Sequence, residues 1–144
     1  MGAWGNGPFD NDEALDLVGD LGASGRPLAD ELTRVLDPGS VRRPGLLARL
    51  RDRHPDREAD DRSDFTVVAA AAVVAAALGL DTGSSSVTEL LAKKPLVVST
   101  GLRAAARAAL DRATGPDSDW FELWEESGEL DRTQAETDRV RQVL

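Results

Sequence analysis

The longest apolar run of the chain, residues 67–78, has no polar side chain on any face. A helix over this run cannot turn a side to water without exposing apolar surface, so it must lie among other helices. Residues 64–80 include seven alanines, which favour a helix because alanine loses no side-chain entropy. The valine pairs alone would allow a strand, but the length of the run favours a helix. We therefore predict a buried central helix that ends at Gly79, with Leu80 folded back onto its last turn.

Two amphipathic helices are predicted before the central helix, over residues 11–21 and 27–36. The first begins with a capping box of Asp10 and Glu13, and the second has Pro27 as its first residue. Their apolar positions recur at helical spacing and are expected to be buried. These positions are Ala14, Leu15, Leu17, Val18, Leu21, Leu28, Leu32, Val35 and Leu36. The other side of the first helix carries, at steps of four, Asp12, Asp16 and Asp20.

Two helices are predicted directly after the central helix. A short one begins with a capping box of Ser86 and Glu89 and is stopped by Pro95, and buried coil follows over residues 96–98. An alanine-rich helix over residues 101–114 then begins at Ser99 or Thr100. It is expected to pack directly on the central helix, because alanine lets helix axes approach to about 8 Å.

The chain is predicted to end in two more helices. A short one is capped by Asp117 or Ser118 and bears four large side chains, Trp120, Phe121, Leu123 and Trp124. The last spans residues 131–144 and turns Val140, Val143 and Leu144 toward the body. A further short helix, marked by Leu46, Leu47 and Leu50, is predicted within residues 41–63. The sum is an all-α fold in one domain over residues 1–144, a compact bundle of six or seven helices around the Ala/Val-rich central helix.

The first nine residues combine three glycines and a proline with two aromatic side chains. We expect a compact coil that folds Trp4 and Phe9 onto the body. The opening, with Gly2-Ala3-Trp4-Gly5, Gly7-Pro8-Phe9, Asn11-Asp12, Ala14 and Asp16, resembles a bacterial family described as domain of unknown function (DUF) family 4259. The alanine-rich helices and Leu123-Trp124-Glu125 extend the resemblance over most of the chain. It implies a small bacterial protein with a structural motif at Trp4, Pro8, Phe9, Asp10 and Asn11, and it brings no activity or catalytic residue with it.

Composition narrows the classes of function. The chain has 144 residues and a net charge of −9, of which −6 falls on residues 1–40 and −6 on residues 115–144. Such acidic ends repel phosphate backbones and attract basic proteins, so we expect no nucleic-acid partner.

Cysteine is absent, which excludes disulfides and thiolate sites. No signal core follows Met1, and the apolar run over residues 67–80 is shorter than the ~20 residues of a membrane span, so we expect a cytoplasmic protein with no membrane contact.

Few side chains indicate catalysis. His54 is the only histidine, and it lies in a segment over residues 41–63 where seven arginines alternate with five acids. We interpret that segment as internally paired surface rather than as a nucleic-acid site.

Carboxylates are abundant and suit a hard cation, but helix capping and solubility explain them more simply. The relevant ones are Asp12, Glu13, Asp16, Glu122, Glu125 and Glu126. An aromatic ligand groove at Trp120, Phe121 and Trp124 is the alternative to our preferred interpretation, in which they anchor a short helix to the core.

Two hypotheses about function remain. The first is a protein-binding module, similar in kind to an immunity protein or antitoxin, that docks a basic partner protein through its acidic faces. Its predicted partner-binding residues are Asp12, Asp16, Asp20, Glu122, Glu125 and Glu126. The alternative is an enzyme that uses a carboxylate-bound divalent metal between the first helix and residues 120–126. We predict no catalytic residue, no resident metal and no cofactor, and the sequence leaves the oligomeric state open.

Overall fold

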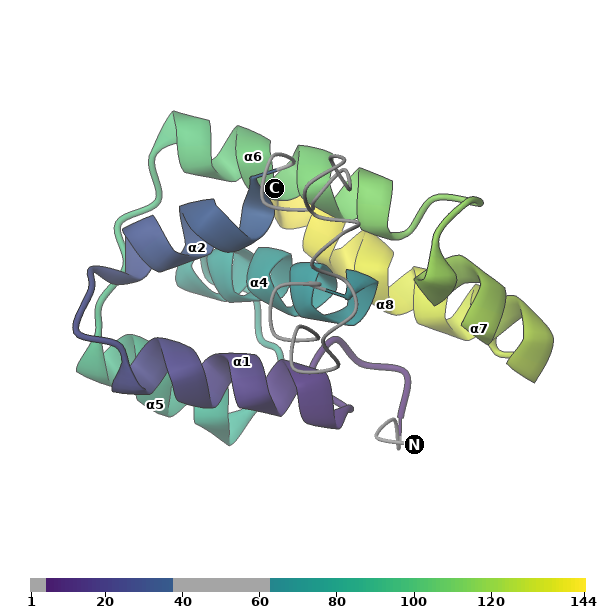
Figure 1. Cartoon of the computed structure of the whole chain (residues 1–144), viewed down its shortest axis with the longest axis horizontal. Coiled ribbons are helices and arrows are strands. Elements are labelled where there is room, and N and C mark those ends of the chain that lie inside the picture. Colours follow the sequence, from purple (N-terminus) through teal and green to yellow (C-terminus); the bar gives the residue numbers. More distant parts are fainter. Residues whose placement is uncertain (1–4, 38–62) are drawn as a thin grey trace, which may run out of the picture.

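The computed structural model describes residues 5–37 and 63–144, and within them it contains seven helices and no strand (Figure 1). The helices are α1 Asp12–Ala23, α2 Leu28–Leu36, α4 Asp64–Ala77, α5 Ser85–Lys93, α6 Thr100–Ala113, α7 Asp119–Ser127 and α8 Leu130–Val143. The predicted all-α fold is confirmed. Trp4, His54 and the short helix predicted within residues 41–63 lie outside the described residues.

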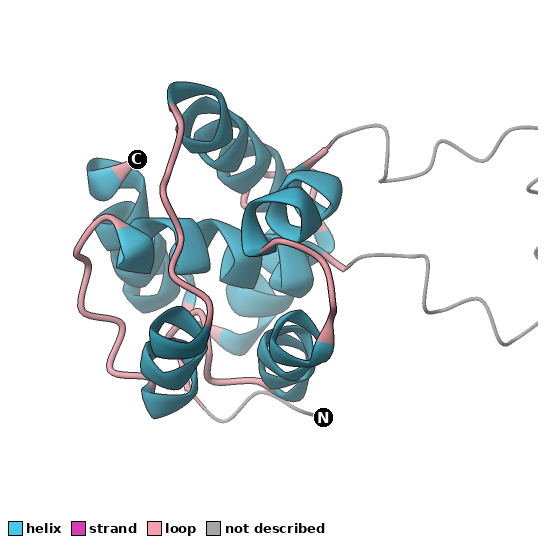
Figure 2. Cartoon of the chain, turned by 90° about the vertical axis from the view of Figure 1, so that its left-hand side faces the viewer, coloured by secondary structure: helices cyan, strands magenta, loops and turns pink. Residues whose placement is uncertain are grey.

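Helix α4 is the centre of the bundle. Residues 67–75 are at most 5% exposed, and α4 contacts each of the other six described helices. Helices α1 and α5 lie on one side of it, and α2 and α6 on the other (Figure 1). A view at right angles shows that the connecting loops run over the outside of the helices (Figure 2). The prediction from the apolar run is therefore confirmed over residues 67–75, whereas Leu78, at the end of the helix, is 38% exposed.

The C-terminus of α4 has the predicted glycine cap. Gly79 has a φ of 112°, in the left-handed region that favours glycine. Its N–H donates to the Ala76 carbonyl at 3.0 Å, and the Leu80 N–H donates to the Ala75 carbonyl at 3.1 Å. Leu80 packs back against the core. This pair of bonds satisfies carbonyls that the helix itself leaves free.

Helix α4 packs more extensively on α6 than on any other helix, as the alanine content of both predicts. The face of α6 toward α4 is built from small side chains and two leucines, namely Leu102, Ala106, Ala109, Leu110 and Ala113, all at most 6% exposed. Because alanine side chains are short, the two backbones approach closely and leave little room for a larger residue.

Five helices begin at a side chain that accepts a hydrogen bond from the first turn, namely Asn11, Ser63, Ser84, Ser99 and Ser118. The sequence left Ser99 or Thr100 and Asp117 or Ser118 open, and the structure uses the serine of each pair; two other predicted caps are wrong. Helix α1 is capped by Asn11, whose Oδ1 accepts from the Ala14 N–H at 2.8 Å, because the Asp10 carboxylate is used in the preceding turn. Helix α5 is capped by Ser84 and not by Ser86, because the hydroxyl of the first of three adjacent serines accepts from the Val87 N–H.

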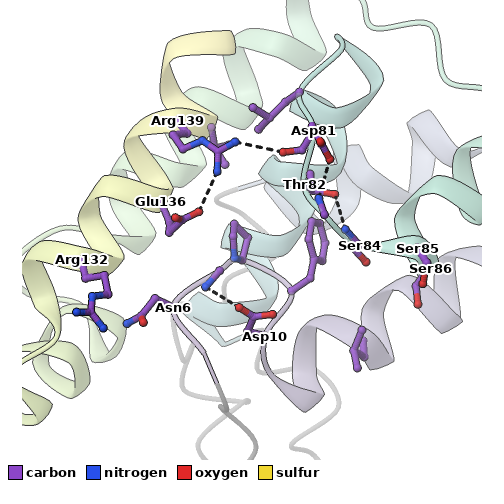
Figure 3. Close-up of a pocket in the computed structure, with 17 residues that line it drawn as sticks. Asn6, Asp10, Asp81, Thr82, Ser84, Ser85, Ser86, Arg132, Glu136 and Arg139 are labelled. Carbon is purple, nitrogen blue, oxygen red and sulfur yellow. Dashed lines mark hydrogen bonds and ion pairs between the residues drawn. The ribbon is translucent and has the colours of Figure 1, made fainter.

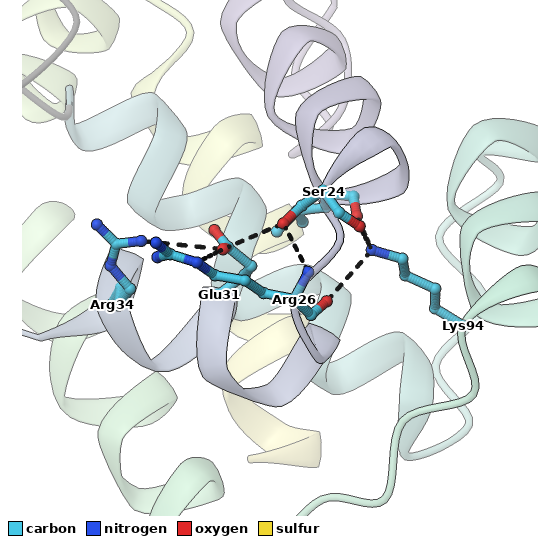
Figure 4. Close-up of polar contacts among 6 residues, drawn as sticks. Ser24, Arg26, Glu31, Arg34 and Lys94 are labelled. Atoms are coloured by element: carbon cyan, nitrogen blue, oxygen red, sulfur yellow. Dashed lines mark hydrogen bonds and ion pairs between the residues drawn. The ribbon is translucent and has the colours of Figure 1, made fainter.

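Helix C-termini are closed by cations from neighbouring helices. Lys94 Nζ, at the end of α5, donates to the carbonyls of Leu21 at 2.7 Å, Ser24, and Arg26 at 3.4 Å (Figure 4). Lys93 Nζ donates to the Gly22 carbonyl at 3.0 Å. These are the only two lysines of the chain, and both reach the end of α1, which has no basic residue in its own last turn. In the same way, the α6 arginines Arg103 and Arg112 cap α8 and α2.

Three burial predictions need correction. Residues 94–99 form coil as expected, but Val97 is 89% exposed, so only Leu96 and Val98 pack against the core. In α8, Val140 and the following Leu144 are buried as predicted, and two threonines that the apolar pattern passes over, Thr133 and Thr137, are 2% exposed. Leu15, predicted to be buried, is 37% exposed. Its position at the edge of a pocket explains this exposure.

Candidate functional site

The N-terminal motif is a turn wrapped around one carboxylate. Asp10 Oδ2 accepts from the Gly7 N–H at 3.0 Å, and the Asp10 N–H donates to the Gly7 carbonyl at 3.1 Å. A Cβ atom added at Gly5 would lie 2.5 Å from Asp10 Oδ2, and one at Gly7 would lie 2.8 Å from it. Both distances are shorter than a carbon and an oxygen tolerate. An alanine at either position would force the Asp10 carboxylate to shift, so its close approach to the turn depends on these two glycines.

The motif also joins distant helices. Asn6 Nδ2 donates to Thr133 Oγ1 on α8 at 2.9 Å, and Asn11 caps α1. Phe9 is 5% exposed and lies in the core, which confirms that the coil folds back onto the body. Thr133 can be buried because its hydroxyl also donates to the Glu129 carbonyl at 2.9 Å. The segment between Gly5 and Asp10 is thus held at both ends.

Beside this segment lies a pocket of about 490 Å³ (Figure 3). Its walls come from residues 6–10, from the loop and helix start at residues 80–86, and from α8, with Leu15 of α1 at one edge. The apolar part of the lining includes Phe9, Leu80 and Val140, and the polar part includes Asp10, Asp81 and Arg139. A volume of this size lies within the range of about 300–1,000 Å³ that is usual for ligand sites.

The two arginines that line the pocket already have acidic partners. Arg139 Nη1 lies 3.3 Å from Glu136 Oε2, and Arg139 Nη2 donates to the Asp81 carbonyl oxygen at 3.4 Å. Arg132 Nη1 lies 3.4 Å from Glu129 Oε2. Among the residues that the structure describes, no cation pairs with the carboxylate of Asp10 or Asp81, and Asp81 Oδ1 accepts from the Gly83 N–H at 2.9 Å. The uncompensated charge at the pocket is therefore negative.

The six predicted partner-binding carboxylates lie on two separate helices. Asp12, Asp16 and Asp20 are exposed along α1, and Glu122, Glu125 and Glu126 are exposed on α7. Figure 1 shows α7 at the right-hand end of the molecule and α1 along its lower left side, so the two sets do not converge. Within residues 5–37 and 63–144, no group of three or more His, Asp or Glu side chains is arranged to hold a metal ion. The geometry thus gives no support to a metal site between α1 and α7.

A carboxylate that the sequence analysis did not select, Asp64, links two helix N-termini. It is the first residue of α4, and its Oδ2 accepts from the backbone N–H groups of Asp119 at 2.9 Å and Trp120 at 3.4 Å at the start of α7. Burial raises the pKa of the Asp64 carboxyl, and the neighbouring Asp119 adds to this, although the two N–H donors act in the opposite direction. Asp64 therefore has a structural role as a hydrogen-bond acceptor, and burying its carboxylate costs desolvation free energy.

The aromatic residues of α7 lie in or against the core. Trp120 is 2% exposed, and Phe121 and Trp124 are partly buried against the same cluster. The Trp124 ring lies 6.5 Å from that of Phe65 on α4, tilted by 55°. These placements are those of anchors that hold a short helix on the bundle.

The family model described as Domain of unknown function (DUF4259) matches residues 2–44 and 45–136. The chain belongs to this family. The DUF4259 match includes the motif segment and all helices of the structure up to the first half of α8. Comparisons with curated proteins and with solved structures gave no match. In the part of this DUF4259 chain that the structure describes, no helix has the length and apolar character needed to span a bilayer.

Proposed function

We propose that this DUF4259 protein is a binding module, comparable in kind to an immunity protein or antitoxin, that docks a basic protein through the acidic face of α1. The observation that supports it is the row of Asp12, Asp16 and Asp20. Their side chains are exposed, and none forms an ion pair or a hydrogen bond with another described residue. Successive members are about 6 Å apart along the helix axis. This spacing is shorter than the Debye length of about 8 Å, so their fields add toward an approaching cation.

The charge distribution of the whole described part supports the same proposal. It holds ten basic and 21 acidic residues, a net charge of −11. Four of the basic residues are used on backbone carbonyls, namely Lys93, Lys94, Arg103 and Arg112. Most of the remaining arginines pair with acids on α2, on α6, and on α8 or at its N-cap. Within the described residues little positive charge is left to neutralise α1, and this favours a basic partner in both association rate and specificity.

The test begins with affinity capture from the source organism at low ionic strength and identification of the captured protein. Its purified form is then titrated by calorimetry against the wild-type chain and against the triple variant D12N/D16N/D20N. We expect the variant to lose about tenfold or more in affinity at about 50 mM salt, and the difference to shrink at about 300 mM, because exposed charges are screened.

The matched control is E122Q/E125Q/E126Q, which removes the same three charges from α7. If the α7 variant weakens binding as much as the α1 variant, net charge alone acts, and the assignment to α1 is wrong. If no basic protein is captured, or if the captured one binds both variants as tightly as the wild type, the proposed function is refuted. Melting temperatures of both variants within about 2 °C of the wild type ensure that a loss of binding is not a loss of fold.

A further inference from the structure

The pocket of about 490 Å³ beside the N-terminal motif has no role in the function proposed above. We propose that it receives a short segment of the basic partner that carries two arginine or lysine side chains. This inference rests on the proposed function, because it assigns an anchoring site to the same partner. It is carried by the pocket, by the apolar groups in its lining, and by two lining carboxylates that form no ion pair with another described residue.

The apolar lining suits the apolar stems of basic side chains. The accessible apolar lining includes Leu15, which is 37% exposed, and Leu80, which is fixed by the glycine cap of α4. Phe9 and Val140, 5% and 1% exposed, are held by the core and add little accessible surface. Arginine and lysine bury their methylene groups on such surfaces and keep the charged head at the rim. Because these walls are fixed before binding, the loss of conformational entropy on binding falls mainly on the partner segment and not on the pocket.

Two carboxylates at the rim suit the charged heads. Asp10 and Asp81 lie on opposite sides of the pocket (Figure 3). Each uses one oxygen on a backbone N–H, of Gly7 and Gly83 respectively, which leaves Asp10 Oδ1 and Asp81 Oδ2 without a hydrogen-bond partner among the described residues. A carboxylate held by one backbone bond is oriented in advance, and a guanidinium or ammonium satisfies its second oxygen.

The arginines of α8 do not reverse this preference. Arg139 is held by Glu136 and by the Asp81 carbonyl, and Arg132 by Glu129. An anionic ligand would have to break these pairs and would still meet Asp10 and Asp81. A cationic segment meets both carboxylates with the pairs intact, so the charge balance selects a basic occupant.

The pocket is continuous with the acidic face of α1. Leu15 lines its edge, is 37% exposed, and stands on α1 between Asp12 and Asp16. A partner that docks on the aspartate row therefore passes over Leu15 into the pocket. In protein interfaces a few anchor residues carry most of the affinity, and an apolar residue beside charged ones, as Leu15 is, suits that role.

The inference is tested on the full chain by ¹⁵N–¹H NMR, with a blocked hexapeptide that carries two arginines separated by two glycines. We expect amide shifts concentrated in residues 6–10 and 80–86 and in the facing part of α8. The variant D10N/D81N keeps an oxygen for the Gly7 and Gly83 N–H groups but removes both charges, and we expect it to weaken the peptide about tenfold, a loss of about 1.4 kcal/mol. The same peptide with glutamate in place of arginine should not bind.

The matched control is D117N/D131N, which removes two charges from exposed aspartates outside the pocket. Equal weakening in both variants, or shifts spread over α1 and α7 with the pocket unchanged, overturns the pocket assignment. The variant D12N/D16N/D20N separates the two proposals. If it leaves the purified partner's affinity unchanged, the α1 proposal fails; if it weakens the partner while D10N/D81N does not, the pocket proposal alone fails.

Discussion

Replacing Lys94 by methionine tests how much a single cation contributes to this fold. The ammonium has three protons, and the structure gives it three acceptors, the carbonyls of Leu21, Ser24 and Arg26. All three belong to the end of α1 or to the turn into α2. K94M keeps a stem of similar length and removes the charge, so it leaves these carbonyls without a donor from α5.

The expected cost follows from these contacts. Hydrogen bonds from charged donors contribute about 1.5–3 kcal/mol each when fully buried, and Lys94 is half-buried. We therefore take about 1 kcal/mol for each bond and about 0.5 kcal/mol for the charge at the helix C-terminus. Ordering the side chain costs about 1.5 kcal/mol. K94M is thus expected to lower the free energy of unfolding by about 2 kcal/mol and the melting temperature by about 6 °C.

The matched control is K93M, which removes the same charge one residue earlier in the chain. Lys93 is exposed and donates to one carbonyl, that of Gly22, so K93M should cost no more than about 0.5 kcal/mol. K94R should recover only part of the loss, because a planar guanidinium does not place three donors around one point. Urea unfolding followed by tryptophan fluorescence measures all three variants. If K94M and K93M agree within about 0.5 kcal/mol, the contribution assigned to the three carbonyls is refuted.

Three further predictions concern stability and are checked by urea unfolding. G7A should cost about 1–3 kcal/mol, because its Cβ would lie 2.8 Å from Asp10 Oδ2, whereas G19A, with nothing within 4 Å inside α1, should stabilise by about 0.5–1 kcal/mol. A71L, at a site that is 0% exposed in α4, should cost about 1–3 kcal/mol. The raised pKa of Asp64 means that its contribution is full below the ordinary value of 3.8 and is lost as the pH rises through the folded value. D64N should therefore gain stability relative to the wild type as the pH rises from about 3.5 to 6.5, and a constant difference over that range would contradict the assignment.

The sequence predicts the helices well where one physical term dominates. The run over residues 67–78 has no polar side, so a helix there avoids exposing apolar surface only in a central position. In α2, the four buried positions are the four that the apolar spacing predicts. Prediction fails where neighbouring residues offer the same chemistry. Asp10 and Asn11 both accept hydrogen bonds at a helix start, and so do Ser84 and Ser86, and only the path of the preceding chain decides between them.

Burial of α8 shows a second limit of the apolar pattern. Thr133 and Thr137 count as polar, yet their hydroxyls are satisfied by the carbonyls of Glu129 and Gln134 within the same helix. Once so bonded, a threonine buries its methyl group at little cost. Val97 is the opposite case, an apolar residue in coil that has no helix to hold it inward. Hydrophobic type alone does not identify either position.

The candidate pocket was beyond sequence reasoning for a different reason. Its walls come from residues 6–10, 80–86 and α8, and no local spacing connects segments so far apart. Only the predicted coil around Phe9 gives a local indication of special packing near it. The apolar spacing of α1 predicts a buried Leu15, but Leu15 lines the pocket and is 37% exposed.

The contacts that fold the N-terminal motif are also the contacts that shape the pocket. The glycines at positions 5 and 7 make room for the Asp10 carboxylate, and the bond from Gly7 orients that carboxylate at the rim. The Asn6 bond to Thr133 fixes the distance between this wall and α8. An alanine at Asp10 would therefore disturb the turn and the rim together, so its effect on binding has no single meaning. Asparagine preserves the bond to Gly7 and removes only the charge, and for that reason it alone separates recognition from folding at this site.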